Sequence, residues 1–102
     1  MSDKRKHVRH DCDFEVEIAV GEDIRPGRAV NISRGGIFVR TDPVPDFGAR
    51  VQLRMQLQGV RERSEIPCVV RWRKPGEGIG LQFETLRAIE AWALNKLLRD
   101  QS

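Results

Sequence analysis

The sequence predicts a mostly β domain: a small antiparallel β-barrel of six strands followed by a C-terminal α-helix. Apolar and polar residues alternate in six short segments, which is the pattern of half-buried strands. Turn residues separate these segments at close intervals, as in a barrel or a sandwich. Near the C-terminus the apolar period changes to three and four residues, which indicates one helix.

The strand segments follow one another between residues 14 and 83. The first is expected at 14–20, where Phe14, Val16 and Ile18 alternate with polar side chains. The second is expected to begin only at residue 28, because Pro26 and Gly27 favour a turn. The other strands are expected near 28–33, 37–40, 51–57, 66–72 and 79–83.

The helix is expected over residues 86–99. Leu86, Ile89, Ala93 and Leu97 recur at helical spacing. Thr85 precedes them and is the expected N-cap, and a basic residue near the end suits the helix dipole.

Length and charge define the domain organisation. The chain has 102 residues, enough for one domain with one modest core. We expect a flexible basic arm at 1–11 and a single barrel domain at 12–102. Lys4, Arg5, Lys6 and Arg9, set against one acidic residue, account for the whole net charge of +3. The charged start and the absence of a long apolar run predict a cytoplasmic protein without membrane insertion.

Neither an enzyme nor a metal site is expected. The sequence has two cysteines, no CxxC, no P-loop and no HExxH. Cys12 lies two residues from His10, but a base on a mobile arm lacks the rigid orientation that a catalytic pair needs. Cys68 is expected to be a small core hydrophobe. The sequence therefore predicts no metal and no cofactor.

Two motifs have the chemistry of an anion and base receptor. The first is Arg5-x-x-x-Arg9 with Lys4 before it, and taken alone it is also compatible with a solvated tail. The second is Asn31-x-Ser33-x-x-Gly36, and taken alone it is also compatible with an ordinary turn.

Strand geometry gives the second motif a direction. Residues two apart in a strand face the same way, so Asn31 and Ser33 are expected on the outer face. Val30 and Ile32 are then expected to fill the barrel. The glycine pair that follows permits a sharp turn or the close approach of a ligand.

Together, in this order and on these elements, the two motifs resemble the signature of the PilZ domain family. RKHVR at 5–9 and NISRGG at 31–36 match its RxxxR and (D/N)xSxxG patterns. The likeness extends over GIFVRT at 36–41, VVRW at 69–72, GIGLQF at 78–83 and the closing helix. It covers nearly the whole chain.

The resemblance implies a bacterial receptor for cyclic di-GMP that signals through a downstream protein. It implies that Arg5 and Arg9 hold phosphate or guanine edges, for which the planar guanidinium is suited. It also implies that the arm is loose without ligand and wraps over it when bound. The ligand-binding residues it implies are Lys4, Arg5, Arg9, Asn31, Ser33, Gly35 and Gly36. An alternative is a PilZ-like adaptor that docks on a protein partner without nucleotide.

The remaining expectations concern the ligand stoichiometry, the two tryptophans, two strand arginines and nucleic-acid binding. In this family an arginine before RxxxR tends to accompany a stacked pair of ligands, so Lys4 leaves the stoichiometry open. Trp72 is expected in the core, although it could contact a guanine, and Trp92 is expected to serve in packing or a partner contact. Arg40 and Arg71 are expected to be solvated. Nucleic-acid binding is disfavoured because the basic excess is confined to one arm.

Overall fold

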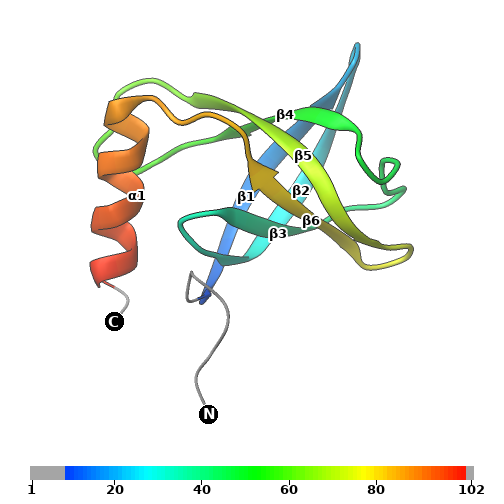
Figure 1. Ribbon diagram of the computed structural model, residues 1–102, viewed down its shortest axis with the longest axis horizontal. Helices are drawn as coiled ribbons and strands as arrows, with labels where there is room; N and C mark the ends of the chain where they lie inside the picture. Colours follow the sequence, from blue (N-terminus) through cyan, green and yellow to red (C-terminus); the bar gives the residue numbers. More distant parts are fainter. Residues whose placement is uncertain (1–8, 101–102) are drawn as a thin grey trace.

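The computed structural model describes residues 9–100 and confirms the expected fold, a six-stranded antiparallel β-barrel with one C-terminal helix (Figure 1). The barrel closes in the order β1-β2-β3-β6-β5-β4, and β4 pairs with β1. Closure removes the exposed edges that an open sheet would leave. The elements are β1 (His10–Val20), β2 (Asp23–Ile32), β3 (Gly36–Arg40), β4 (Arg50–Met55), β5 (Ser64–Lys74), β6 (Gly78–Phe83) and α1 (Ala88–Asp100).

The barrel interior is filled by aliphatic side chains from all six strands. Cys68 is completely buried among them, as expected of a small core hydrophobe. The helix α1 covers one end of the barrel (Figure 1) and adds its own apolar face to the same core. The most deeply buried strand residues are Val16, Ile18, Ala29, Ile32, Val39, Leu53, Met55, Ile66, Val70 and Ile79, and α1 contributes Ala93, Leu94 and Leu98.

The second strand begins earlier than its sequence suggests. The expected start at residue 28 is wrong, since β2 begins at Asp23 and contains Pro26 and Gly27. Pro26 pairs with β1, but the pairing of β2 with β3 begins only at Arg28, so no partner on that side needs a proline N–H. The strand that pairs with β2 along most of its length, β1, begins at His10, so its first two residues lie within 1–11, the range expected to be the arm.

The helix begins two residues later than expected. It starts at Ala88, and Thr85 is exposed outside it, so Thr85 is not the N-cap. Instead the carboxylate of Glu90 accepts a 2.9 Å hydrogen bond from the backbone N–H of Arg87, the residue before the helix. This is the carboxylate half of a capping box. The helix is neither long nor apolar enough to cross a membrane, nor is any other among the described residues.

Register shifts occur in three strand pairs of the barrel, and the β-bulges in β2 and β5 decide which residues face outward beside the β3–β6 pair. In β2, Ala29 pairs with Val39 but Asn31 pairs with Phe38, so one extra residue, Val30, lies between them. In β5 the register against β6 shifts between Val70 and Trp72 in the same way. A bulge of one residue turns the side chains that follow it to the opposite face. The bulges lie on the same side of the barrel, because both affect strands that flank the β3–β6 pair.

Candidate functional site

The turn between β2 and β3 is organised by the hydroxyl group of Ser33. Its oxygen accepts hydrogen bonds from the backbone N–H groups of Gly35 and Gly36, each at 3.2 Å. The backbone N–H of Ser33 donates to the Gly36 carbonyl at 2.8 Å. Ser33 is 7% exposed. In this structure its hydroxyl therefore holds the turn, and a direct bond from Ser33 to a ligand stays a prediction.

Gly36 is required by the approach of β3 to β6. A Cβ atom at this position would lie 2.2 Å from the carbonyl oxygen of Leu81, a backbone atom that cannot move aside without disturbing the strand. The glycine pair was expected to permit a sharp turn or the close approach of a ligand. At Gly36 it is the neighbouring strand β6 that approaches closely. Gly35 is tied to the same place, since its carbonyl accepts a 3.0 Å bond from the N–H of Phe83.

The two sequence motifs meet in space at Arg9 and Asn31. The guanidinium of Arg9 donates a 3.3 Å hydrogen bond to the side-chain oxygen of Asn31 across 22 residues of sequence. Asn31 faces outward, as expected, because the bulge at Val30 places it beside Phe38. The expectation that Val30 fills the barrel is wrong, since it is only half-buried and borders the same outer surface as Asn31. Lys4 and Arg5 lie outside the described residues.

Two aromatic side chains, Phe38 and Trp72, lie next to the Arg9–Asn31 pair, and we call the surface that they form the shelf. Gly80 of β6 is paired with Phe38 on one side and with Trp72 on the other. Because Gly80 has no side chain, the two rings approach across it, with their centroids 5.2 Å apart and their planes tilted by 55°. Trp72 is 49% exposed. The expectation that Trp72 belongs to the core is therefore wrong, and the β5 bulge is the reason.

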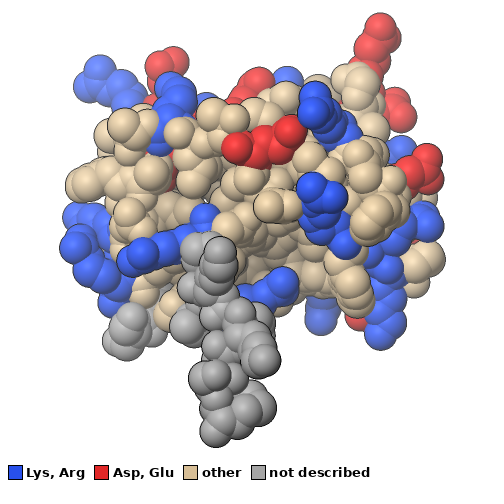
Figure 2. Space-filling view, in the orientation of Figure 1, with Lys and Arg blue, Asp and Glu red and all other residues tan. Residues whose placement is uncertain are grey.

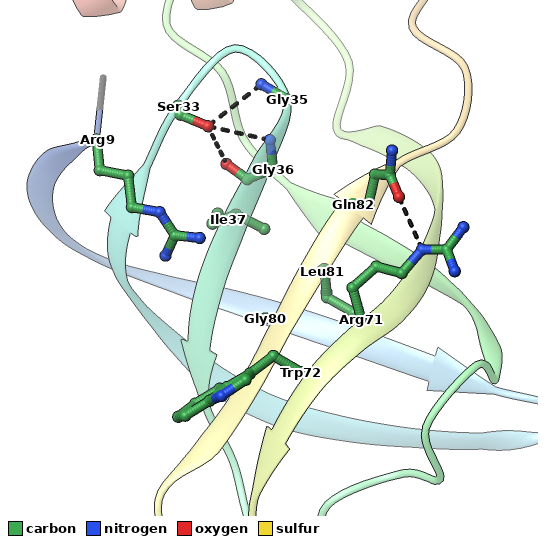
Figure 3. A pocket seen from close by; sticks show the side chains of 10 residues that line it. All are labelled: Arg9, Ser33, Gly35, Gly36, Ile37, Arg71, Trp72, Gly80, Leu81 and Gln82. Atoms are coloured by element: carbon green, nitrogen blue, oxygen red, sulfur yellow. Dashed lines mark hydrogen bonds between the residues drawn. The ribbon is translucent and has the colours of Figure 1, made fainter. Parts of the chain in front are cut away.

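The shelf borders two adjoining hollows of about 380 and 620 Å³. Figure 3 shows Arg9 and Arg71 on opposite sides of the paired strands β3 and β6, with Trp72 at one end and the 33–36 turn at the other. We call the two hollows together the Trp72 groove. Its lining includes Arg9, Ser33, Gly35, Gly36, Ile37, Phe38, Asn31, Arg40, Arg71, Trp72, Glu77, Gly80, Leu81 and Gln82.

The charge of the groove is mainly positive. Arg9, Arg40 and Arg71 line it against one carboxylate, that of Glu77. The guanidinium of Arg71 is oriented by a 2.8 Å hydrogen bond from its Nε to the side-chain oxygen of Gln82. In Figure 2 basic side chains appear on both sides of the hollowed middle of this face. The groove therefore combines arginine forks for an anion with a flat aromatic surface.

Arg40, Arg71 and Trp72 were not expected to share a site. Alternation along a regular strand places Arg71 and Trp72 on opposite faces, and only the bulge turns both toward the groove. Gly80, which is itself paired with Phe38 and with Trp72, is the sequence feature that indicates a surface depression. Its position beside the two aromatic residues follows only from the strand register, which the sequence alone does not give.

The raised pKa values of the two cysteine thiols do not favour a catalytic role. Burial, followed by the nearby Asp11 and Asp13 carboxylates, raises the pKa of Cys12 to about 11. Burial likewise raises the pKa of Cys68 to about 12. Both thiols are therefore protonated and weakly nucleophilic near neutral pH. Across residues 9–100 no group of three or more His, Cys, Asp or Glu side chains is placed to hold a metal ion.

Comparison with known proteins agrees with the observed fold. Residues 3–100 match the PilZ domain family. The fold is similar to the Bacillus subtilis inhibitor of motility MotI (DgrA), with a TM-score of 0.74 and 25% identity, over 98% of this chain and 52% of that one. This chain thus spans about half the length of the B. subtilis chain. The search of curated proteins gave no match.

Two further structures share the fold. The PilZ domain of CeSA from a cellulose-synthesizing bacterium has a TM-score of 0.68 at 21% identity, over 91% of this chain and 96% of that one. The PilZ domain of Escherichia coli YcgR with c-di-GMP has a TM-score of 0.70 at 12% identity, over 97% and 92%. Since the family match covers almost the entire chain and the barrel is shared, the chain belongs to the PilZ domain family.

Proposed function

We propose that this domain is a receptor for cyclic di-GMP and that the ligand lies in the Trp72 groove. The observation that carries the proposal is the hydrogen bond between Arg9 and Asn31, because it joins the two halves of the sequence signature at the mouth of a basic, aromatic-lined hollow. PilZ domains are non-catalytic receptors, so the expectation that this domain is not an enzyme holds.

The groove offers a separate contact for each part of the ligand. We call residues 1–8 of the basic arm the leader. Arg9, together with Arg5 from the leader, supplies paired N–H donors for a phosphate or for the O6/N7 edge of guanine. Asn31 supplies an amide for a purine edge once Arg9 turns from it to the ligand. Trp72 supplies a flat surface for a base, since half of its side chain is exposed.

The proposed signal is a change in the conformation of the leader. In the proposed mechanism residues 1–8 close over the bound nucleotide through Lys4 and Arg5, and the closed form is recognised by a downstream protein. The ordering would use part of the binding free energy. Hydrogen exchange of the leader amides should therefore slow when the nucleotide is added, and unchanged exchange would contradict the closure step.

Isothermal titration with cyclic di-GMP tests the receptor proposal and gives the stoichiometry that Lys4 leaves open. Each of Arg5→Ala and Arg9→Ala should weaken binding by roughly 10- to 100-fold, as expected for loss of a charge-assisted hydrogen bond of ~1.5–3 kcal/mol. Arg50→Ala is a matched control, because Arg50 is an exposed strand arginine that pairs with Glu84, away from the groove lining. Unchanged affinity in both motif variants would reject this site.

A further inference from the structure

A second surface, on α1, is separate from the Trp72 groove. Ile89, Trp92, Lys96 and Arg99 are spaced three, four and three residues apart, so they form one stripe along the helix. All four are exposed, whereas the opposite face of α1 is buried on the barrel. We call these four residues the α1 stripe. Ile89 and Trp92 are 43% and 48% exposed and lie one turn apart, so they form a small apolar surface on the outer side of the helix.

Trp92 is held in place on this stripe. One part of its ring lies against Gly59 in the loop between β4 and β5, where a Cβ atom would come within 2.9 Å of the indole. Gly59 has a φ of +91°, a conformation that favours glycine. The ammonium group of Lys96 lies 5.5 Å from the ring centroid. The indole is therefore fixed against the domain while about half of it stays open to a partner, which lowers the entropy lost on binding.

The charge of the α1 stripe indicates the chemistry of its partner. Lys96 and Arg99 are both basic, and the carboxylate that α1 carries in its first turn, Glu90, is buried. In Figure 2 basic side chains appear among uncharged ones at the lower left, over the C-terminal half of α1. An aromatic anchor beside two cations complements a surface that presents apolar side chains among carboxylates.

Two other occupants fit the stripe less well. A second copy of this chain would bring the four cations of two stripes into one interface, where neither stripe offers an exposed carboxylate to pair them, which is unfavourable. A lipid surface requires a broad apolar helix face, but the apolar face of α1, with Ala93, Leu94 and Leu98, is already used by the barrel. An acidic protein partner is left as the occupant that the observations favour.

We propose that the α1 stripe is a docking surface for an acidic, apolar-anchored segment of a partner protein. The inference extends the proposed function by giving the receptor an output surface, and it rests on that function only for the relay of nucleotide occupancy. Docking is tested without nucleotide, so that its failure leaves the receptor proposal untouched.

The probe is a synthetic peptide in which leucine recurs every three or four residues among Glu and Asp. A second peptide of identical pattern carries Lys in place of the acids. In an NMR titration the acidic peptide should shift the signals of the α1 stripe in a saturable way, and the basic peptide should not. Trp92→Ala should weaken binding by at least about 10-fold, the effect of losing an aromatic hot spot.

The charge-reversed variant Lys96→Glu/Arg99→Glu keeps the proposal testable if Trp92→Ala fails to fold. It replaces only exposed side chains and should transfer the preference to the basic peptide. Trp72→Ala is the matched control and should bind the acidic peptide like the wild type. Equal affinity for both peptides, no effect of the charge reversal, self-association through the stripe, or a preference for anionic phospholipid vesicles over the peptide would each overturn the proposal.

Discussion

Replacing Trp72 by alanine should weaken cyclic di-GMP binding while the barrel stays folded. Trp72 is paired across Gly80 with Phe38, and about half of its side chain is accessible from the Trp72 groove. If a guanine base lies on this ring, removing the indole removes the stacking surface but leaves the arginine contacts intact. The loss should therefore be partial.

The magnitude follows from the exposure of the ring. Stacking of a base on an aromatic side chain contributes ~1–3 kcal/mol, which corresponds to a loss of affinity of roughly 5- to 150-fold. A fully buried aromatic residue costs about 3–5 kcal/mol when it is truncated to alanine. Since half of Trp72 is already in solvent, we expect the free energy of unfolding to fall by about 1–2 kcal/mol.

The chain provides an internal control for this experiment. Trp92 has nearly the same exposure, 48% against 49%, but it lies on α1. Calorimetric titration of Trp72→Ala and Trp92→Ala, with urea unfolding of each, separates a lost contact from general destabilisation. Wild-type affinity in Trp72→Ala, or an equal loss in both variants, would refute the assignment of Trp72 to the ligand site.

Three further predictions concern the groove and the helix. Gly80→Val should reduce nucleotide affinity by at least about 10-fold in a folded protein, because a Cβ atom at this position would lie only 3.2 Å from that of Trp72 and would fill the shelf; wild-type affinity would show that the shelf is not used. Gly36→Ala should instead lower the free energy of unfolding by ~1–3 kcal/mol, measured by urea unfolding, because its Cβ would meet the Leu81 carbonyl. Burial alone would raise the pKa of Glu90, but hydrogen bonds from Arg87 bring it below its ordinary value of 4.5. The carboxylate therefore stabilises the domain above that pH and the stabilisation is lost as the pH falls through the lowered pKa. Glu90→Gln should remove this part of the acid dependence of the melting temperature, and an unchanged pH profile would contradict the capping role.

The fold was predictable because alternation and helical spacing are strong signals. The strands around Ile18, Leu53 and Ile79 each place aliphatic residues at every second position, and all three residues are completely buried. Errors occurred where a neighbouring element decides the outcome. Pro26 is tolerated inside β2 only because β3 has ended there, which the local sequence does not reveal.

The arrangement of the candidate site was predictable in part. The bond between Arg9 and Asn31 agrees with the motif pattern. Trp72 and Val30 were assigned to the wrong face, because each strand carries an extra residue that reverses the alternation. The helix begins two residues later than predicted, because a contact within its first turn decides where it starts. The cap is provided by the buried carboxylate of Glu90 rather than by a residue of high N-cap preference such as Thr85.

The most direct test of the account is a crystal structure of this domain with cyclic di-GMP. It should show a guanine against the Trp72 ring and a phosphate or guanine edge held by the guanidinium of Arg9, with Asn31 turned to the nucleotide. A nucleotide bound elsewhere on the barrel, with the groove between Arg9 and Arg71 empty, would contradict the account.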